Sequence, residues 1–262
     1  MFEPFHSRTV ELLREWNYRQ YLRSENRDEK FLAPARNILE GNIRHKWIDQ
    51  YNTKFLVRKR LIKDVRAHLF LKWIKHNFPE IPIILLLRHP CAVAGSKIEK
   101  GWDTHLADFL MQEELMTDFL NPFKDRIVAT RDIFEKHILM WCIENYVPLR
   151  QFSTGEILVT FYENLCINPR KEIEDILSFV GMEFSPRVFH LHAKPSAQSR
   201  NESAVVLGTS LINSWRNQIS DSQVERAVDI LRGFGLQAIY GEDDLPLLTG
   251  KDALKVFAAK NL

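Results

Sequence analysis

The apolar residues of this chain follow two patterns, unbroken runs and helical stripes. Ile83 to Leu87 is an unbroken run of five apolar residues, which predicts a strand covered on both faces of a parallel sheet. Glu156 to Tyr162 is rich in β-branched and aromatic residues and predicts a second strand. The segment KFLVRKRLIKD predicts a further strand near Arg60 to Ile62, ending at Lys63. Strands that alternate with helical stripes indicate an α/β fold.

Five further segments show the periodicity of a helix. Apolar residues recur at helical spacing over 8–27, 65–78, from 130 onward, over 168–180 and over 220–235. With a predicted strand on either side, the second of these helices would complete one βαβ unit. Ser220 and Gln223 predict a capping box at the start of the last helix, and Asn168 before Pro169 predicts another helix start.

Residues 101–126 mix aromatic with acidic side chains and allow two interpretations. Trp102, Phe109, Phe119 and Phe123 stand among aspartates and glutamates. In one interpretation the segment is a lid over a bound acceptor. In the other, short helices pack these aromatic side chains into the core.

Composition favours one large globular domain without a strongly charged surface. The chain has 262 residues, of which 45% are hydrophobic and 27% charged, so it can bury a sizeable core. Its formal net charge is only +2, which predicts neither a nucleic acid nor a membrane surface as a partner. The longest apolar run is too short to cross a bilayer, and the first thirteen residues lack the apolar core of a signal peptide.

The cysteines and histidines argue against disulfides and against a metal site. Cys91, Cys142 and Cys166 form no C-x-x-C pair, which is typical of free thiols in a reducing compartment such as the cytoplasm. His190 and His192 have no nearby cysteine and no second histidine pair to complete a ligand set. We therefore expect no bound metal.

The turn after the first strand carries candidate chemistry. Arg88 stands at the carboxyl end of the strand, His89-Pro90 ends it, and the helix that follows carries Ser96. In open α/β sheets, ligands bind outside the carboxyl ends of the strands. Arginine offers a planar fork of donors for phosphate oxygens, and serine adds one donor. Arg88 and Ser96 therefore predict an anion clamp.

A family resemblance rests on the same turn. Arg88, Pro90, Val93 and Ser96 form the pattern R-x-P-x-x-V-x-x-S after an apolar strand. This pattern resembles the element with which sulfotransferases grip the 3′-phosphate of 3′-phosphoadenosine 5′-phosphosulfate (PAPS). The resemblance implies a P-loop-NTPase-like parallel sheet flanked by helices, with Arg88 and Ser96 as cofactor-binding residues.

Two further blocks resemble the same family. Tyr162-Glu163-Asn164-Leu165 resembles its Y-E-D-L element, in which the tyrosine lies against the adenine. The resemblance implies that Tyr162 stacks on the base. Asn164 departs from the usual aspartate, which puts the bonding of the loop in doubt more than cofactor binding. The segment LIKDVRAHLF resembles the block with a Lys-Asp pair at a strand end, so the resemblance places Lys63 near the active crevice.

The later part of the chain also resembles the family. Residues 193–218 are hydroxyl-rich, like the loop that sulfotransferases use near the nucleotide. Candidate phosphate donors there are Ser199, Arg200, Ser203 and Thr209, and the alternative is a serine-rich surface loop. The ending GLQAIYGEDD resembles the usual family ending, so we expect one domain over residues 1–244 and a C-terminal tail over 245–262.

One family element does not occur in the sequence. Sulfotransferases hold the 5′-phosphosulfate with a strand, a P-R-S-G-T-type loop and a helix, and the chain contains neither such a loop nor G-x-x-x-x-G-K-[ST]. Its start, MFEPFH, resembles the F-E-P-F segment shortly after that loop in bacterial relatives, so we expect the first βα unit to be missing. By the same resemblance Glu3 or His6 takes the acceptor proton, and Lys63 is the third catalytic candidate.

The resemblance implies a PAPS-dependent sulfotransferase acting on a hydroxyl or amine of a small-molecule, carbohydrate or lipid acceptor. Because the 5′ loop does not occur, we expect the chain to bind the nucleotide but to transfer sulfate poorly or not at all. The alternative is a non-catalytic nucleotide-binding or interaction module. A P-loop kinase relative is disfavoured by the lack of a Walker A sequence and of a magnesium-binding aspartate. The acidic segment 103–125 argues against a polyanionic glycan as acceptor.

Overall fold

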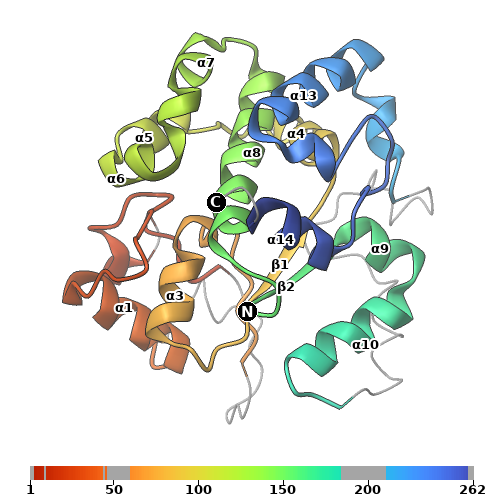
Figure 1. The fold of residues 1–262 in the computed structure, drawn as a ribbon. Helices are drawn as coiled ribbons and strands as arrows, with labels where there is room; N and C mark the ends of the chain where they lie inside the picture. The colour runs from red at the N-terminus through yellow and green to blue at the C-terminus, as the bar shows by residue number, and fades with distance from the viewer. Residues whose placement is uncertain (1–2, 9, 44, 46–59, 184–210, 259–262) are drawn as a thin grey trace. The chain divides into compact units, whose positions relative to one another are not determined.

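The computed structural model describes residues 3–8, 10–43, 45, 60–183 and 211–258 (Figure 1). The chain forms two compact units. The first unit consists of residues 1–81 and 105–122, and the second of residues 82–104 and 123–262.

The first unit is helical in its described part. Its helices are α1 (Glu29–Glu40), α3 (Leu71–Asn77), α5 (Leu106–Leu110) and α6 (Glu113–Leu115). Single turns complete it: 3₁₀ turns at Glu11–Leu13 and His68–Phe70, and a π-helical turn at Met116–Leu120. A further 3₁₀ turn, Asn121–Phe123, lies where the chain passes into the second unit.

The core of the first unit is aromatic and is centred on Trp16. Its ring lies edge-on to those of Phe31, Phe70 and Trp73, at centroid distances of 5.3, 5.4 and 6.2 Å. Pro34 stands inside α1 and has no N–H to donate to the carbonyl of Lys30, four residues earlier. The indole Nε1 of Trp16 donates to that carbonyl instead, at 3.3 Å. The packing of Trp16 therefore also satisfies the backbone group that the proline leaves open.

Two predictions for the first unit are wrong. The expected helix over 8–27 is reduced to the turn Glu11–Leu13, because the buried residues Val10, Leu13 and Trp16 recur every three residues, a spacing that suits a 3₁₀ turn. The expected strand at 60–62 is absent, since residues 60–63 form no strand and the side chain of Leu61 is 76% exposed. The predicted βαβ unit required that strand and is therefore wrong as well.

The helix expected over 65–78 is confirmed in a shorter form. The turn His68–Phe70 leads into α3, and the helix ends before Phe78-Pro79 as predicted. Leu69, Phe70, Trp73 and Ile74 are buried, while Val65 precedes the helical residues and is exposed.

The second unit contains a parallel sheet. Its strands are β1 (Ile84–Leu87) and β2 (Leu158–Phe161), paired in parallel from Ile84 opposite Leu158 to Leu87 opposite Phe161. Both predicted strands and their parallel direction are confirmed. The expectation that β1 is covered on both faces is wrong, because Leu86 is 49% exposed. The sheet of the described residues has only these two strands.

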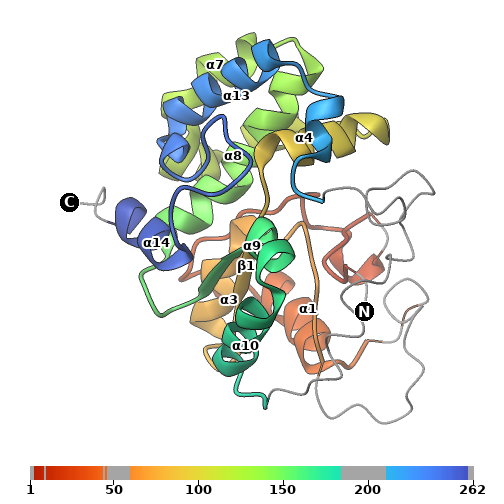
Figure 2. The same ribbon diagram turned by 90° about the vertical axis from the view of Figure 1, so that its right-hand side faces the viewer.

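Helices make up the rest of the second unit (Figure 2). They are α4 (Pro90–Glu99), α7 (Lys124–Ala129), α8 (Ile133–Gln151), α9 (Tyr162–Ile167), α10 (Pro169–Phe179), α13 (Asp221–Phe234) and α14 (Gly250–Ala258), with 3₁₀ turns at Ser214–Asn217 and Leu236–Ala238. Helix α8 is the centre, because α4, α13 and α14 all pack against it. None of the described helices combines the length and apolar character needed to span a membrane.

Several local signals in the second unit are confirmed. Ser220 and Gln223 form the predicted capping box of α13, and Gly235 ends that helix with a φ of 74°. Helix α10 begins at Pro169 as predicted, although the side chain of Asn168 makes no capping hydrogen bond. In the segment 101–126, Phe109 is fully buried in a short helix, whereas Trp102 is 53% exposed. The packing interpretation therefore holds for Phe109 and not for Trp102.

The segment expected to be a C-terminal tail contains α14. This helix packs against α8 and β2, and its residues Ala253, Leu254 and Phe257 are buried. Gly250, its first residue, lies so close to β2 that a Cβ there would overlap the backbone carbonyl of Val159. The approach of α14 to the sheet therefore requires glycine at this position.

This contact predicts opposite effects for two glycine substitutions. Gly250→Ala should destabilise the protein by about 1 to 3 kcal/mol, because backbone must move to relieve the overlap. Gly233→Ala should stabilise it by roughly 0.5 to 1 kcal/mol, since Gly233 lies within α13 and a Cβ there meets only Arg126 at an ordinary 3.6 Å. Urea unfolding measures both. If Gly250→Ala were neutral, α14 would not pack on β2.

Candidate functional site

Apart from Ser96, which lies in α4, the predicted site residues fall into two clusters and one segment outside the described residues. Arg88 and Tyr162 belong to a group at the end of the sheet, which we call the strand-end cluster: Arg88, His89, Trp141, Tyr162, Glu163, Trp215 and Tyr240. Glu3, His6 and Lys63 belong to a group in the first unit, which we call the Glu3 cluster: Glu3, His6, Tyr18, Lys63, Asp64 and Arg66. The candidates Ser199, Arg200, Ser203 and Thr209 lie outside the described residues.

Strand pairing brings Arg88 and Tyr162 together. Leu87 pairs with Phe161 in parallel register, so the residue after each strand stands at the same edge of the sheet. The guanidinium carbon of Arg88 lies 4.5 Å from the ring centroid of Tyr162, a cation–π contact. Burial raises the pKa of the Tyr162 hydroxyl, which therefore stays protonated at neutral pH. The predicted position of Arg88 directly after the strand agrees with the structure.

The turn after Arg88 is held by side chains from three other elements. The indole Nε1 of Trp141, in α8, donates to the carbonyl of Arg88 at 3.0 Å. The backbone N–H of His89 donates to Oε1 of Glu163 at 2.9 Å. The hydroxyl of Tyr240 donates to Oε2 of Glu163 at 2.8 Å. Glu163 is only 1% exposed, so its carboxylate belongs to the interior of the unit.

The ring of His89 adds packing and no charge. It stacks on Trp215 with a centroid distance of 4.6 Å and an interplanar angle of 11°. Burial lowers the pKa of His89 to about 4, so the ring is neutral at pH 7. Of Arg88 and His89, only Arg88 therefore carries a positive charge at neutral pH.

Ser96 lies on the helix that follows the turn. Pro90 is the first residue of α4, and Ser96 is half-buried about 9 Å further along the helix axis. Helix α4 begins two residues after Arg88, so both residues belong to one strand–turn–helix segment. That they bind one phosphate together stays a prediction.

The Glu3 cluster contains all three catalytic candidates. Nζ of Lys63 lies 3.0 Å from Oε1 of Glu3, and Arg66 pairs with the other carboxylate oxygen. Arg66 also donates to the hydroxyl of Tyr18 at 2.8 Å. The ring of His6 lies edge-on to Tyr18 at 5.5 Å. Tyr18 was not predicted, because an isolated tyrosine in a polar segment gives no sequence signal.

The charges in the Glu3 cluster distinguish the two candidate bases. Burial alone would raise the pKa of Glu3, but the charges and hydrogen bonds of Arg66 and Lys63 outweigh it and hold the pKa below its usual value. Burial, aided by the charge of Arg66, lowers the pKa of His6. His6 is therefore a neutral imidazole at pH 7, ready to accept a proton, whereas Glu3 is a weakly basic carboxylate held by two cations.

Asp64 joins the start of the chain to the segment that carries Lys63. Its two carboxylate oxygens accept from the backbone N–H of Phe5 at 2.8 Å and of Arg66 at 2.7 Å. Burial raises the pKa of Asp64 to about 6 in spite of these bonds.

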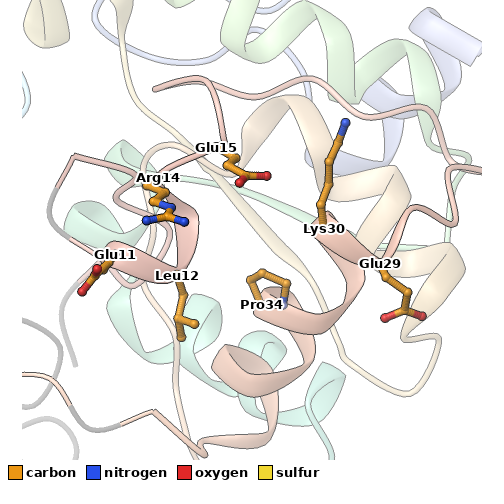
Figure 3. A pocket seen from close by; sticks show the side chains of 7 residues that line it. All are labelled: Glu11, Leu12, Arg14, Glu15, Glu29, Lys30 and Pro34. Carbon is orange, nitrogen blue, oxygen red and sulfur yellow. The ribbon is translucent and has the colours of Figure 1, made fainter.

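A hollow in the first unit contains none of the predicted site residues. It has a volume of about 500 Å³, and Figure 3 shows the side chains that line it: Glu11, Leu12, Arg14, Glu15, Glu29, Lys30 and Pro34. Three acidic and two basic side chains line it, so their formal charges do not favour an anion. Among the described residues, no group of histidine, cysteine, aspartate and glutamate side chains is arranged to hold a metal ion.

Comparison with known proteins agrees with the resemblance drawn from the sequence. A family model described as the sulfotransferase domain matches residues 20–238, which include β1, α4 and β2. No curated protein matches the chain significantly. The match covers most of the chain, and the predicted family is confirmed.

The raised pKa of Asp64 predicts a pH-dependent stability. An acid whose pKa rises on folding stabilises the protein while it is protonated, so this contribution is complete below about pH 4 and is lost as the pH rises through about 6. Between these values the native protein should lose up to about 3 kcal/mol relative to Asp64→Asn, which cannot titrate. Urea unfolding of both proteins from pH 4 to 7 measures the difference. A constant difference would contradict the raised pKa.

Proposed function

Because the chain belongs to the sulfotransferase family, we propose that it binds PAPS and transfers the sulfuryl group to a hydroxyl or amine acceptor. Family membership itself indicates sulfuryl transfer in general. The observation that carries the proposal of PAPS as donor is the contact of Arg88 with Tyr162. A cation and an aromatic ring at the carboxyl edge of a parallel sheet suit a phosphorylated nucleoside.

The nucleotide roles follow from the chemistry of each residue. Arg88 would hold the 3′-phosphate with charge-assisted hydrogen bonds, and Ser96 would add a neutral donor. The ring of Tyr162, half-buried and already in contact with Arg88, would stack on the adenine. Ser199 and Arg200 are proposed as further phosphate donors from the segment outside the described residues.

The first unit contains the proposed catalytic residues. Sulfuryl transfer needs an acceptor oxygen that attacks in line while charge develops on the leaving phosphate. We assign proton removal to His6 before Glu3, because its lowered pKa leaves the imidazole neutral. Lys63, whose side chain is 61% exposed, would stabilise the developing charge, with Glu3 orienting its ammonium group. We propose a small-molecule, carbohydrate or lipid acceptor and, since the three cysteines are free, a cytoplasmic location.

A second candidate function is a non-catalytic nucleotide-binding module. The observation that favours it is that the proposed nucleotide residues of the described part, Arg88, Ser96 and Tyr162, all belong to the second unit, whereas the three catalytic candidates belong to the first. Both proposals include the nucleotide site, but only the first predicts that the chain transfers sulfate from PAPS.

The nucleotide site predicts a graded loss of affinity. Arg88→Ala should weaken the binding of adenosine 3′,5′-bisphosphate by about 2 kcal/mol, and Ser96→Ala by about 1 kcal/mol, because the first removes a charge-assisted bond and the second a neutral donor. Isothermal titration calorimetry measures both. Arg232→Ala, an exposed arginine on α13, is the matched control and should bind like the wild type. Equal affinity of Arg88→Ala and the wild type would refute the site.

Turnover decides between the two functions. With labelled PAPS and a panel of hydroxyl and amine acceptors, transfer to any acceptor would show that the chain is an enzyme. The rate should rise as His6 loses its proton, over a pH range lower than that of an ordinary imidazole because its pKa is lowered, and His6→Ala should lose this dependence. Nucleotide binding without turnover on any acceptor would favour the module.

A further inference from the structure

We propose that Glu163 is a positioning residue that fixes Arg88 for phosphate recognition, with Tyr240 holding the Glu163 carboxylate in place. This inference rests on the proposed nucleotide site and assigns a role to a residue that does not itself touch the ligand.

The peptide unit that joins Arg88 to His89 lies in the turn between β1 and α4. Its carbonyl accepts from Trp141 Nε1 at 3.0 Å, and its N–H donates to Glu163 Oε1 at 2.9 Å. Both polar groups of one peptide in a strand-to-helix turn are thus bonded to side chains. Rotation of this peptide would break both bonds at once. Since the plane of the peptide sets the direction in which Arg88 leaves the strand, the two side chains orient the guanidinium.

Glu163 suits this role because it is itself held. It is 1% exposed, and its second oxygen accepts from the Tyr240 hydroxyl at 2.8 Å. Tyr240 is fully buried and lies edge-on to His89 at 5.2 Å and to Trp141 at 5.9 Å. One tyrosine therefore supports both groups that bond the Arg88–His89 peptide.

The chain segment after β2 holds Arg88 at two points. Tyr162 lies beneath the guanidinium, 4.5 Å from its carbon, and the next residue, Glu163, bonds the backbone that follows Arg88. Side chain and main chain of Arg88 are thus fixed by consecutive residues. Preorganisation of this kind lowers the entropy that a long side chain loses when it binds a phosphate.

The test compares two nucleotides that differ in the 3′-phosphate, adenosine 3′,5′-bisphosphate and adenosine 5′-monophosphate, by calorimetry on the full chain. Glu163→Ala should weaken the bisphosphate about tenfold, since the arginine loses its orientation, and should leave the monophosphate within about threefold. Glu163→Gln keeps an acceptor oxygen for the His89 N–H and should restore bisphosphate affinity to within about threefold of the wild type. Glu172→Ala is the matched control, because it removes a carboxylate that bonds Thr160 of β2 and not the Arg88 turn.

A double-mutant cycle tests whether Glu163 affects nucleotide binding through Arg88. If Glu163 acts through Arg88, the double variant Arg88→Ala, Glu163→Ala binds the bisphosphate no more weakly than Arg88→Ala alone. Tyr240→Phe removes only the hydroxyl that holds Glu163, so it tests the same role if Glu163→Ala does not fold, and it should also weaken the bisphosphate selectively. Thermal unfolding of each variant shows that the folded protein is being compared.

The outcomes separate this inference from the proposed function. If Arg88→Ala binds the bisphosphate as the wild type does, the nucleotide site itself is wrong. If Arg88→Ala weakens the bisphosphate but the Glu163 and Tyr240 variants weaken both nucleotides equally, or add fully to Arg88→Ala, Glu163 is a purely structural residue and the inference is overturned.

Discussion

The parallel pairing of β1 with β2 is the constraint on which the second unit depends. Because Leu87 pairs with Phe161, the residues that leave the two strands, Arg88 and Tyr162, stand side by side. Strands of the same direction have their carboxyl ends at one edge, so an arginine and a tyrosine separated by more than seventy positions in the sequence share a surface. Helices α9 and α4 then start at that edge and carry the chain away from it.

Buried polar groups determine how rigid that edge is. A buried carboxylate such as that of Glu163 has lost its water and must be bonded on both oxygens to be tolerated. His89 and Tyr240 supply those bonds, so the interior of the unit and the direction of Arg88 depend on the same groups. If Arg88 binds the phosphate as proposed, stability and recognition depend on the same groups in the strand-end cluster.

The buried carboxylates of the first unit are also bonded, in part through ion pairs. Glu3 is buried between Lys63 and Arg66, and Asp64 accepts two backbone N–H groups. These contacts join the start of the chain to residues some sixty positions later. Those residues directly follow the strand that the sequence predicted at 60–62 and that does not form. Arg66 and Lys63 lower the pKa of Glu3 and make it a poor base, whereas burial, aided by Arg66, lowers the pKa of His6 and leaves it neutral.

The sequence by itself determined the elements whose signals are local. The apolar run before Arg88, the β-branched run before Tyr162 and the capping box of Ser220 each lie within a few residues, and each formed as predicted. Only the tertiary structure decided the rest. Leu61 pairs with no strand among the described residues and is exposed, while the contacts of Glu163, Tyr240 and Tyr18 come from residues far along the chain. Strand pairing and the burial of charge depend on partners far along the chain, which a local pattern does not specify.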